Sequence, residues 1–151
     1  LVDRKIVDAI MTLMKKYHIK VQHIAFEVTE TSLVENSAME PMLRQLKKIG
    51  FSIAIDAFGT GYSSLSRLKD LPIDTLKIDK SFVLGSTVSK ELRVIIENTV
   101  ALAKNLNLHL IAEGVETKQN VTFLLEKECP YGQGFYLSKP LSLEEVKKLL
   151  F

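Results

Sequence analysis

Four short apolar runs in this sequence each end on an acidic side chain, and this repeated placement constrains the fold more than any other feature. The four acids are Glu27, Asp56, Asp79 and Glu113. A buried strand gains nothing by ending on a carboxylate, but ligands bind at the carboxyl ends of parallel strands in α/β sheets and barrels. Several carboxylates at one rim offer the oxygen ligands that hard divalent cations take. The pattern therefore indicates a site for a metal ion and a phosphate.

The composition is that of an ordinary globular domain and excludes several classes of protein. The net charge of +2 comes from 20 basic and 18 acidic residues, a balance that gives no support for binding a nucleic-acid polymer. The single cysteine, Cys129, excludes an intrachain disulfide framework and fits a reducing compartment. No apolar stretch approaches the ~20 residues that span a bilayer, and no signal peptide is visible. We therefore expect a cytoplasmic domain with no membrane segment.

The hydrophobic periodicity switches between helix and strand along the whole chain. Helical stripes cover residues 1 to 17 and Leu92 to Leu106, for example, and a short helix is expected over Ser64 to Leu68. The runs between the helices are almost continuously apolar, as in strands buried on both faces. We expect five strands, the last over Gly134 to Leu137, and a sixth if Pro130 to Gln133 pairs with the sheet. Such alternation predicts a parallel sheet with right-handed crossovers.

Two glycine-rich segments follow strand ends. Residues 56 to 64 read Asp-Ala-Phe-Gly-Thr-Gly-Tyr-Ser-Ser, and glycines on both sides of Thr60 let the backbone approach a ligand closely or change conformation. A plain turn in which Ser63 caps the next helix is the alternative. Gln133 also lies between two glycines. That arrangement suits a side chain needed near a ligand and an ordinary turn equally well.

Lys77 lies two residues before the acid that ends its strand. Alternation along a strand places Lys77 and Asp79 on one face, toward the interior of a barrel or the rim above it. An ammonium group in such a place is costly unless it meets an anion. That anion is either a ligand or, in the structural alternative, the carboxylate of Asp79 or Asp56.

Five motifs together resemble one family. In chain order they are Phe26 to Thr31, Ile55 to Leu65, Leu76 to Asp79, Ala112 to Thr117, and Gln133 to Phe135 with Ser138 to Pro140. They resemble the EAL domain, the cyclic di-GMP phosphodiesterase family of bacterial signalling proteins. The resemblance extends over essentially all 151 residues.

The resemblance implies an α/β fold, a TIM-like (β/α) barrel, and it also shows what this chain lacks. The Glu-Ala-Leu segment that gives the family its name is absent, and so is a later strand that carries an asparagine ligand. A complete barrel needs ~250 residues, so about the first two strands are missing. We expect a single partial EAL domain over residues 1–151 that either self-associates to cover its sheet edges or belongs to a longer protein with upstream signalling domains.

The resemblance also implies roles for individual residues. The metal ligands would be Glu27 and Asp56, with Asp79 as a further candidate, for a pair of Mg²⁺ or Mn²⁺ ions. The catalytic group would be Lys77, which holds or helps to activate the attacking water, with Glu113 in the metal or water shell and Gln133 near the substrate phosphate. The loop that contains Phe58, Gly59, Thr60 and Gly61 would be anchored by Glu116. The implied reaction hydrolyses one phosphodiester of cyclic di-GMP to give linear pGpG.

Ala57 departs from the family pattern at a position that matters for chemistry. The loop motif usually has a second aspartate there, which would bind the second metal ion and the nucleophilic water. Because magnesium tolerates poor geometry badly, we expect this chain alone to be weakly active or inactive. Two functions follow: a phosphodiesterase-family domain, or a degenerate EAL domain that senses cyclic di-GMP or docks a partner without turnover. A third interpretation, acids with only structural roles in a generic α/β domain, conflicts with five motifs in register.

Overall fold

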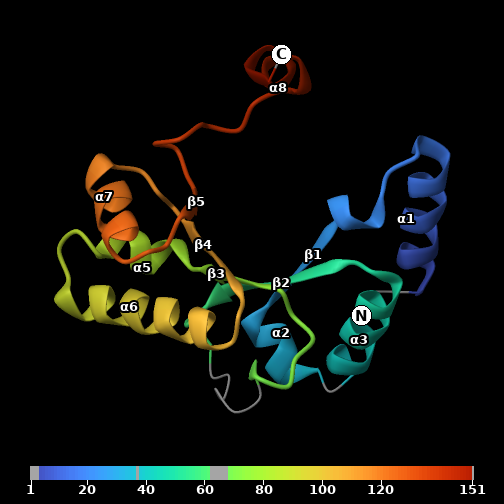
Figure 1. The fold of residues 1–151 in the computed structure, drawn as a ribbon, viewed down its shortest axis with the longest axis horizontal. Helices are drawn as coiled ribbons and strands as arrows, with labels where there is room; N and C mark the ends of the chain where they lie inside the picture. The colour runs from blue at the N-terminus through green and yellow to red at the C-terminus, as the bar shows by residue number, and fades with distance from the viewer. Residues whose placement is uncertain (1–3, 37, 62–67, 151) are drawn as a thin grey trace.

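The computed structural model describes residues 4–36, 38–61 and 68–150, and its core is one parallel sheet (Figure 1). The described residues form five strands in the order β1-β2-β3-β4-β5, and every neighbouring pair is parallel. The strands are β1 (Ala25–Thr29), β2 (Ser52–Phe58), β3 (Thr75–Ile78), β4 (His109–Glu113) and β5 (Tyr131–Gln133). This confirms the alternating α/β architecture, and the open array of strands agrees with an incomplete barrel.

Among the described residues, helices lie between β1 and β2, between β3 and β4 and between β4 and β5, as the crossover connections of a parallel sheet require, and further helices precede β1 and follow β5. They are α1 (Arg4–Tyr17), α2 (Glu30–Glu35), α3 (Met39–Ile49), α5 (Lys80–Gly85), α6 (Lys90–Asn105), α7 (Lys118–Glu126) and α8 (Leu143–Leu150), with a short 3₁₀ turn at Val21–His23. Gly50 ends α3 with φ of +107°, a left-handed conformation that glycine adopts at little cost. The helix expected over Ser64 to Leu68 lies almost entirely outside the described residues.

The last strand differs from its predicted position. Residues 131–133 form β5, whereas Gly134 to Leu137 form a turn in which the N–H of Leu137 donates to the carbonyl of Gly134. Gly134 packs so closely on Val115 that a Cβ there would lie 2.2 Å from the Val115 carbonyl oxygen. The apolar side chains that suggested a strand, Phe135 to Leu137, are instead exposed on this turn. The alternative strand at Pro130 to Gln133 is therefore the fifth strand rather than a sixth.

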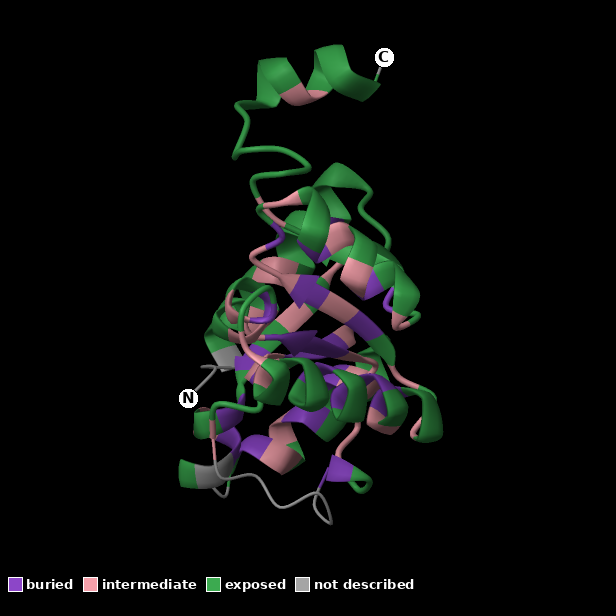
Figure 2. Cartoon of the chain, turned by 90° about the vertical axis from the view of Figure 1, so that its left-hand side faces the viewer, coloured by how far each residue is buried: buried purple, intermediate pink, exposed green. Residues whose placement is uncertain are grey.

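The hydrophobic core lies between the sheet and the helices that follow its strands (Figure 2). Its fully buried side chains include Phe51, Ile53, Ile55, Leu76 and Ile96. Because β1 and β5 are the two edge strands, each pairs on one side only within the described part of the chain. α8 stands apart from the sheet and exposes Leu143, Leu149 and Leu150 (Figures 1 and 2). No helix in the described ranges is long and apolar enough to cross a membrane.

Candidate functional site

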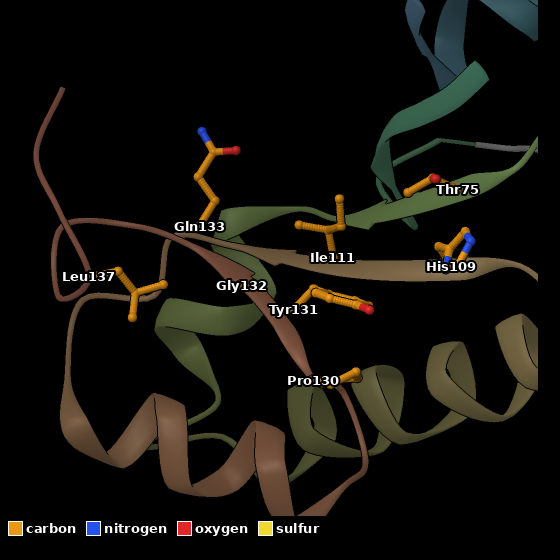
Figure 3. A pocket seen from close by; sticks show the side chains of 8 residues that line it. All are labelled: Thr75, His109, Ile111, Pro130, Tyr131, Gly132, Gln133 and Leu137. Carbon is orange, nitrogen blue, oxygen red and sulfur yellow. The ribbon is translucent and has the colours of Figure 1, made fainter. Parts of the chain in front are cut away.

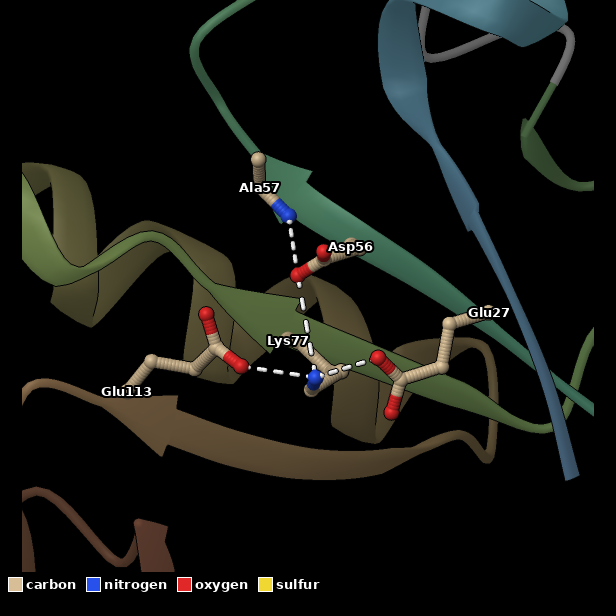
Figure 4. Close-up of polar contacts among 5 residues, drawn as sticks. All are labelled: Glu27, Asp56, Ala57, Lys77 and Glu113. Carbon is tan, nitrogen blue, oxygen red and sulfur yellow. Dashed lines mark hydrogen bonds and ion pairs between the residues drawn. The ribbon is translucent and has the colours of Figure 1, made fainter. Parts of the chain in front are cut away.

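Lys77 is the centre of an ion cluster to which four neighbouring strands contribute (Figure 4). Its side-chain nitrogen Nζ lies 2.7 Å from Oε2 of Glu27 and 2.6 Å from Oε1 of Glu113. Oδ1 of Asp56 lies 3.7 Å from the same nitrogen. Since β1, β2, β3 and β4 are adjacent and parallel, these side chains meet at one edge of the sheet. The convergence inferred from the strand ends is thus present in the structure.

The charges in this cluster do not cancel. Lys77 is only 5% exposed, and three carboxylates face its single positive charge. Burial alone lowers the pKa of Lys77, but hydrogen bonds to Glu113 and Glu27 and the nearby charges of Glu113 and Asp56 outweigh burial, so the pKa of this lysine is raised. The lysine therefore stays protonated, and the cluster keeps an excess of negative charge.

Asp56 is fixed by a backbone irregularity in β2. The pairing of β2 with β3 shifts register between Ile55 and Phe58, and Ala57 within this shift has φ of +53°. In that conformation the N–H of Ala57 donates to Oδ1 of Asp56 at 2.8 Å. The same carboxylate oxygen therefore faces both the Ala57 amide and the Lys77 ammonium group (Figure 4). Figure 4 also shows that Ala57 contributes no side-chain oxygen to the cluster.

The loop after β2 is anchored by Glu30, a residue that the sequence analysis did not identify. Glu30 is 3% exposed, and its Oε2 accepts the N–H of Gly59 at 2.8 Å and of Gly61 at 3.1 Å. The anchoring role that the resemblance implies for Glu116 stays a prediction, and at Gly59 and Gly61 the loop is held by Glu30. The usable signal was position: Glu30 directly follows β1, and the carboxyl ends of β1 and β2 are neighbours in a parallel sheet.

Asp79 is set apart from the other three acids by its own contacts. Its side chain caps α5 by accepting the N–H of Ser81 at 2.8 Å, and it also accepts the Ser81 hydroxyl. The three carboxylates that meet Lys77 are those of Glu27, Asp56 and Glu113. The metal-ligand role of Asp79 therefore stays a prediction, and the structure gives this residue a capping role.

Gln133 ends β5 directly beside Glu113, with which it is paired in register. Its carbonyl accepts the N–H of Val115 at 3.0 Å, so the backbone here is fixed, while the side chain is exposed. Figure 3 shows Gln133 at one end of an open groove of about 600 Å³. The groove is lined along adjacent strands by Thr75, His109, Ile111, Pro130, Tyr131, Gly132 and Leu137. Gln133 is thus close to the acidic cluster and accessible to a ligand.

The donor chemistry of the cluster fits a divalent cation that brings further ligands with it. Within the described residues, no group of three or more His, Cys, Asp or Glu side chains is arranged to hold a metal ion by itself. However, magnesium usually binds through one or two carboxylates and completes its shell with water and substrate phosphate oxygens. The side chains of Glu27 and Asp56 are 51% and 31% exposed, so both can offer oxygens to such an ion.

Comparison with known proteins gives consistent matches. The EAL domain profile matches residues 1–140. Cyclic di-GMP phosphodiesterase NbdA of Pseudomonas aeruginosa is 38% identical over 146 residues, which are 96% of this chain and 19% of that protein. The chain thus spans about a fifth of the length of this relative.

Solved structures agree with the profile. The EAL domain of Mycobacterium smegmatis DcpA is 41% identical, with a TM-score of 0.90 over 99% of this chain and 68% of that one. A manganese and cyclic di-GMP complex of Klebsiella pneumoniae BlrP1 is 29% identical, with a TM-score of 0.82 over 89% of this chain and 34% of that one. The sheet and its helices are therefore those of a known barrel fold.

Proposed function

Because the chain belongs to the EAL domain family, we propose that its strand-end rim binds cyclic di-GMP together with Mg²⁺ or Mn²⁺. The parent reaction is hydrolysis of one phosphodiester bond to give linear pGpG. The observation that carries the proposal is the convergence of three carboxylates on the ammonium group of Lys77. Buried charge at the carboxyl ends of parallel strands is typical of functional sites rather than of cores.

We assign cation binding first to Glu27 and Asp56. Their carboxylates are the more exposed of the three in the cluster, so a hydrated ion can reach them. Asp79 remains a further candidate that would have to give up its cap on α5. When bound, a divalent cation lowers the pKa of a coordinated water and neutralises charge on the attacked phosphate.

Lys77, Glu113 and Gln133 would act on water and phosphate. Two of the three N–H donors of the Lys77 ammonium group serve Glu27 and Glu113, which leaves donor capacity for a water or phosphate oxygen. Glu113 meets Lys77 through Oε1, and its other carboxylate oxygen can accept a hydrogen bond from water. The Gln133 amide, one strand away, can donate to a phosphate oxygen.

The proposal includes weak turnover by this chain. Ala57 offers no oxygen at a position where the family motif carries a carboxylate, and the described acids do not form a complete metal cage. Because magnesium demands near-ideal octahedral geometry, a missing ligand should impair the position of the ion more than the contacts that the protein itself makes to the nucleotide. Binding is therefore expected to survive better than catalysis, and a non-catalytic sensor of cyclic di-GMP is the second candidate function.

Calorimetry of cyclic di-GMP binding in the presence of Mg²⁺ or Mn²⁺ tests the binding part. Glu27→Gln should weaken binding by at least about tenfold, because it removes a charged oxygen from the cluster. Glu40→Gln is the matched control, since Glu40 pairs with Arg44 on the exposed surface of α3. No measurable binding by the wild-type chain, or equal effects of both substitutions, would overturn the proposal.

Chromatography of the nucleotides after incubation with Mn²⁺ separates the two functions. The phosphodiesterase assignment expects slow pGpG formation that Ala57→Asp accelerates. The sensor assignment expects binding without pGpG from either chain. Rapid turnover by the wild-type chain would refute the inference drawn from Ala57.

We also propose that the two edge strands of the sheet are covered by other protein segments. Within the described residues β1 and β5 each pair on one side only, and such edge strands invite association, so the chain either self-associates in the cytoplasm or is covered by further segments of a longer signalling protein. Sedimentation at micromolar concentration tests the first option, which a stable monomer would contradict.

A further inference from the structure

Asn120 is a buried polar side chain whose amide group contacts two different elements. It is 1% exposed. Its Oδ1 accepts the N–H of Thr117 at 3.0 Å and the Thr117 hydroxyl at 2.7 Å, while its Nδ2 donates to the carbonyl of Val83 at 2.9 Å. A buried amide with satisfied bonds on both ends fixes the relative position of the groups that it joins.

The oxygen of the Asn120 amide bonds to a residue nearby in the sequence, and its nitrogen bonds to a residue far from it. Oδ1 belongs to a capping box with Thr117, which is a local arrangement at the start of α7. A capping box does not need Nδ2. That nitrogen instead reaches 37 residues back along the chain, to α5. α5 follows β3 directly and is therefore continuous with the strand that carries Lys77.

The turn between Glu113 and α7 is held on two further sides. The N–H of Val115 donates to the carbonyl of Gln133 at 3.0 Å, which joins the turn to β5. Gly114 has φ of +70° and packs so closely on α5 that a Cβ at this position would lie 2.6 Å from Cβ of Lys80. The turn after Glu113 is thus enclosed by α5, β5 and α7, and Asn120 supplies the side-chain hydrogen bond between α7 and α5.

We propose that Asn120 is a positioning residue: its hydrogen bond to the Val83 carbonyl acts together with the direct pairing of β3 and β4 to fix the separation between Lys77 and Glu113. Lys77 is carried by the β3–α5 unit, and Glu113 by the β4–α7 unit. The contact of 2.6 Å between them tolerates little relative movement of those units. Asn120 touches neither the cluster nor any proposed ligand position. The inference rests on the proposed function only for its effect on nucleotide binding.

Three substitutions separate the local role from the long-range one. Asn120→Asp keeps an oxygen for the capping box but replaces the Nδ2 donor by a second oxygen, so the bond to Val83 is lost. Asn120→Ser removes the same bond without adding a buried charge and decides the question if the aspartate variant does not fold. Thr117→Val is the matched control, because it removes the capping hydroxyl and leaves the Nδ2 bond in place.

Nuclear magnetic resonance measures the rate at which the Lys77 ammonium protons exchange with water, and a change in the cap of α7 alone should not alter this rate. Both Asn120 variants should weaken the Lys77–Glu113 hydrogen bond and so speed exchange of these protons with water by about fivefold, the factor expected for loss of one hydrogen bond, and they should weaken cyclic di-GMP binding. Thr117→Val should lower Tm but leave the exchange rate at the wild-type value.

Equal losses of Tm in all three variants, with unchanged ammonium exchange, would overturn the inference and leave Asn120 a cap only. A wild-type chain that binds no nucleotide would instead count against the proposed function. The exchange measurement would still decide the role of Asn120 in that case.

Discussion

Ala57 has a left-handed backbone conformation, and substitutions at this one position test both the stability of the fold and the binding of a metal ion. Ala57 has φ of +53°, where a Cβ costs about 1–2 kcal/mol and glycine is unstrained. Part of this gain is offset because glycine has more freedom in the unfolded chain. Ala57→Gly should therefore stabilise the fold by about 0.5–1 kcal/mol. For a chain of this size, each kcal/mol of added stability raises Tm by about 2–4 °C.

Two further substitutions at position 57 complete the series. Ala57→Val should destabilise the fold, because a β-branched side chain is the least tolerant of positive φ. Ala57→Asp should leave the metal-free Tm nearly unchanged, since aspartate tolerates this conformation but adds a negative charge beside Asp56. With Mn²⁺ present, however, the aspartate variant should gain stability, by about 2.7 kcal/mol at 100 times the dissociation constant.

Thermal unfolding by circular dichroism, with and without MnCl₂, measures all of these changes. The expected order of metal-free Tm is glycine, then alanine and aspartate, then valine. The metal-dependent rise should be largest for aspartate. Equal Tm for the glycine and valine variants would refute the backbone argument. A Mn²⁺-dependent rise that is the same for alanine and aspartate would refute the assignment of a missing ligand at this position.

Three other predictions follow from buried groups. Lys77→Met should lower the free energy of urea unfolding by about 2 kcal/mol at neutral pH, because hydrogen bonds to charged groups are lost and the part-exposed carboxylates then repel one another. Because pairing raises the pKa of Lys77, this difference should persist from neutral pH up to the ordinary value of 10.5 and shrink as pH rises beyond it. Glu30→Ala, which removes the acceptor oxygen, should speed amide exchange at Gly59 and Gly61 by about fivefold, and unchanged exchange would exclude Glu30 as the anchor. Burial raises the pKa of Cys129 to about 11, so a thiol reagent at pH 8 should react with the unfolded chain only, and rapid labelling of the folded chain would contradict its burial.

The parallel α/β sheet and the cluster of side chains around Lys77 could be predicted from the sequence, because both depend on repeated local patterns. Apolar runs alternating with helical stripes require parallel strands, and parallel strands end at one edge. Placing Glu27, Asp56, Lys77 and Glu113 together needs only that rule and the two-residue period of a strand. No knowledge of distant contacts is required.

The differences arise where a residue's partner lies elsewhere in the fold. Glu30 reveals its role only once β1 and β2 are adjacent, since its partners are amides of Gly59 and Gly61. Asp79 is a different case, because its partner Ser81 is local: an aspartate between a strand and a helix is a preferred N-cap residue, and this sign could be read from the sequence. Phe135 to Leu137 look like a strand because they are apolar, but close packing of Gly134 on Val115 bends the chain before them.

Paramagnetic broadening by Mn²⁺ tests the central claim most directly, because it locates the ion without requiring turnover. As Mn²⁺ is added to the isotopically labelled chain, the amide signals of Glu27, Asp56 and Lys77 should broaden first. Cyclic di-GMP should lower the Mn²⁺ concentration that is needed. Broadening that begins at surface acids such as Glu144 in α8, with the signals of the Lys77 cluster unaffected, would contradict the account.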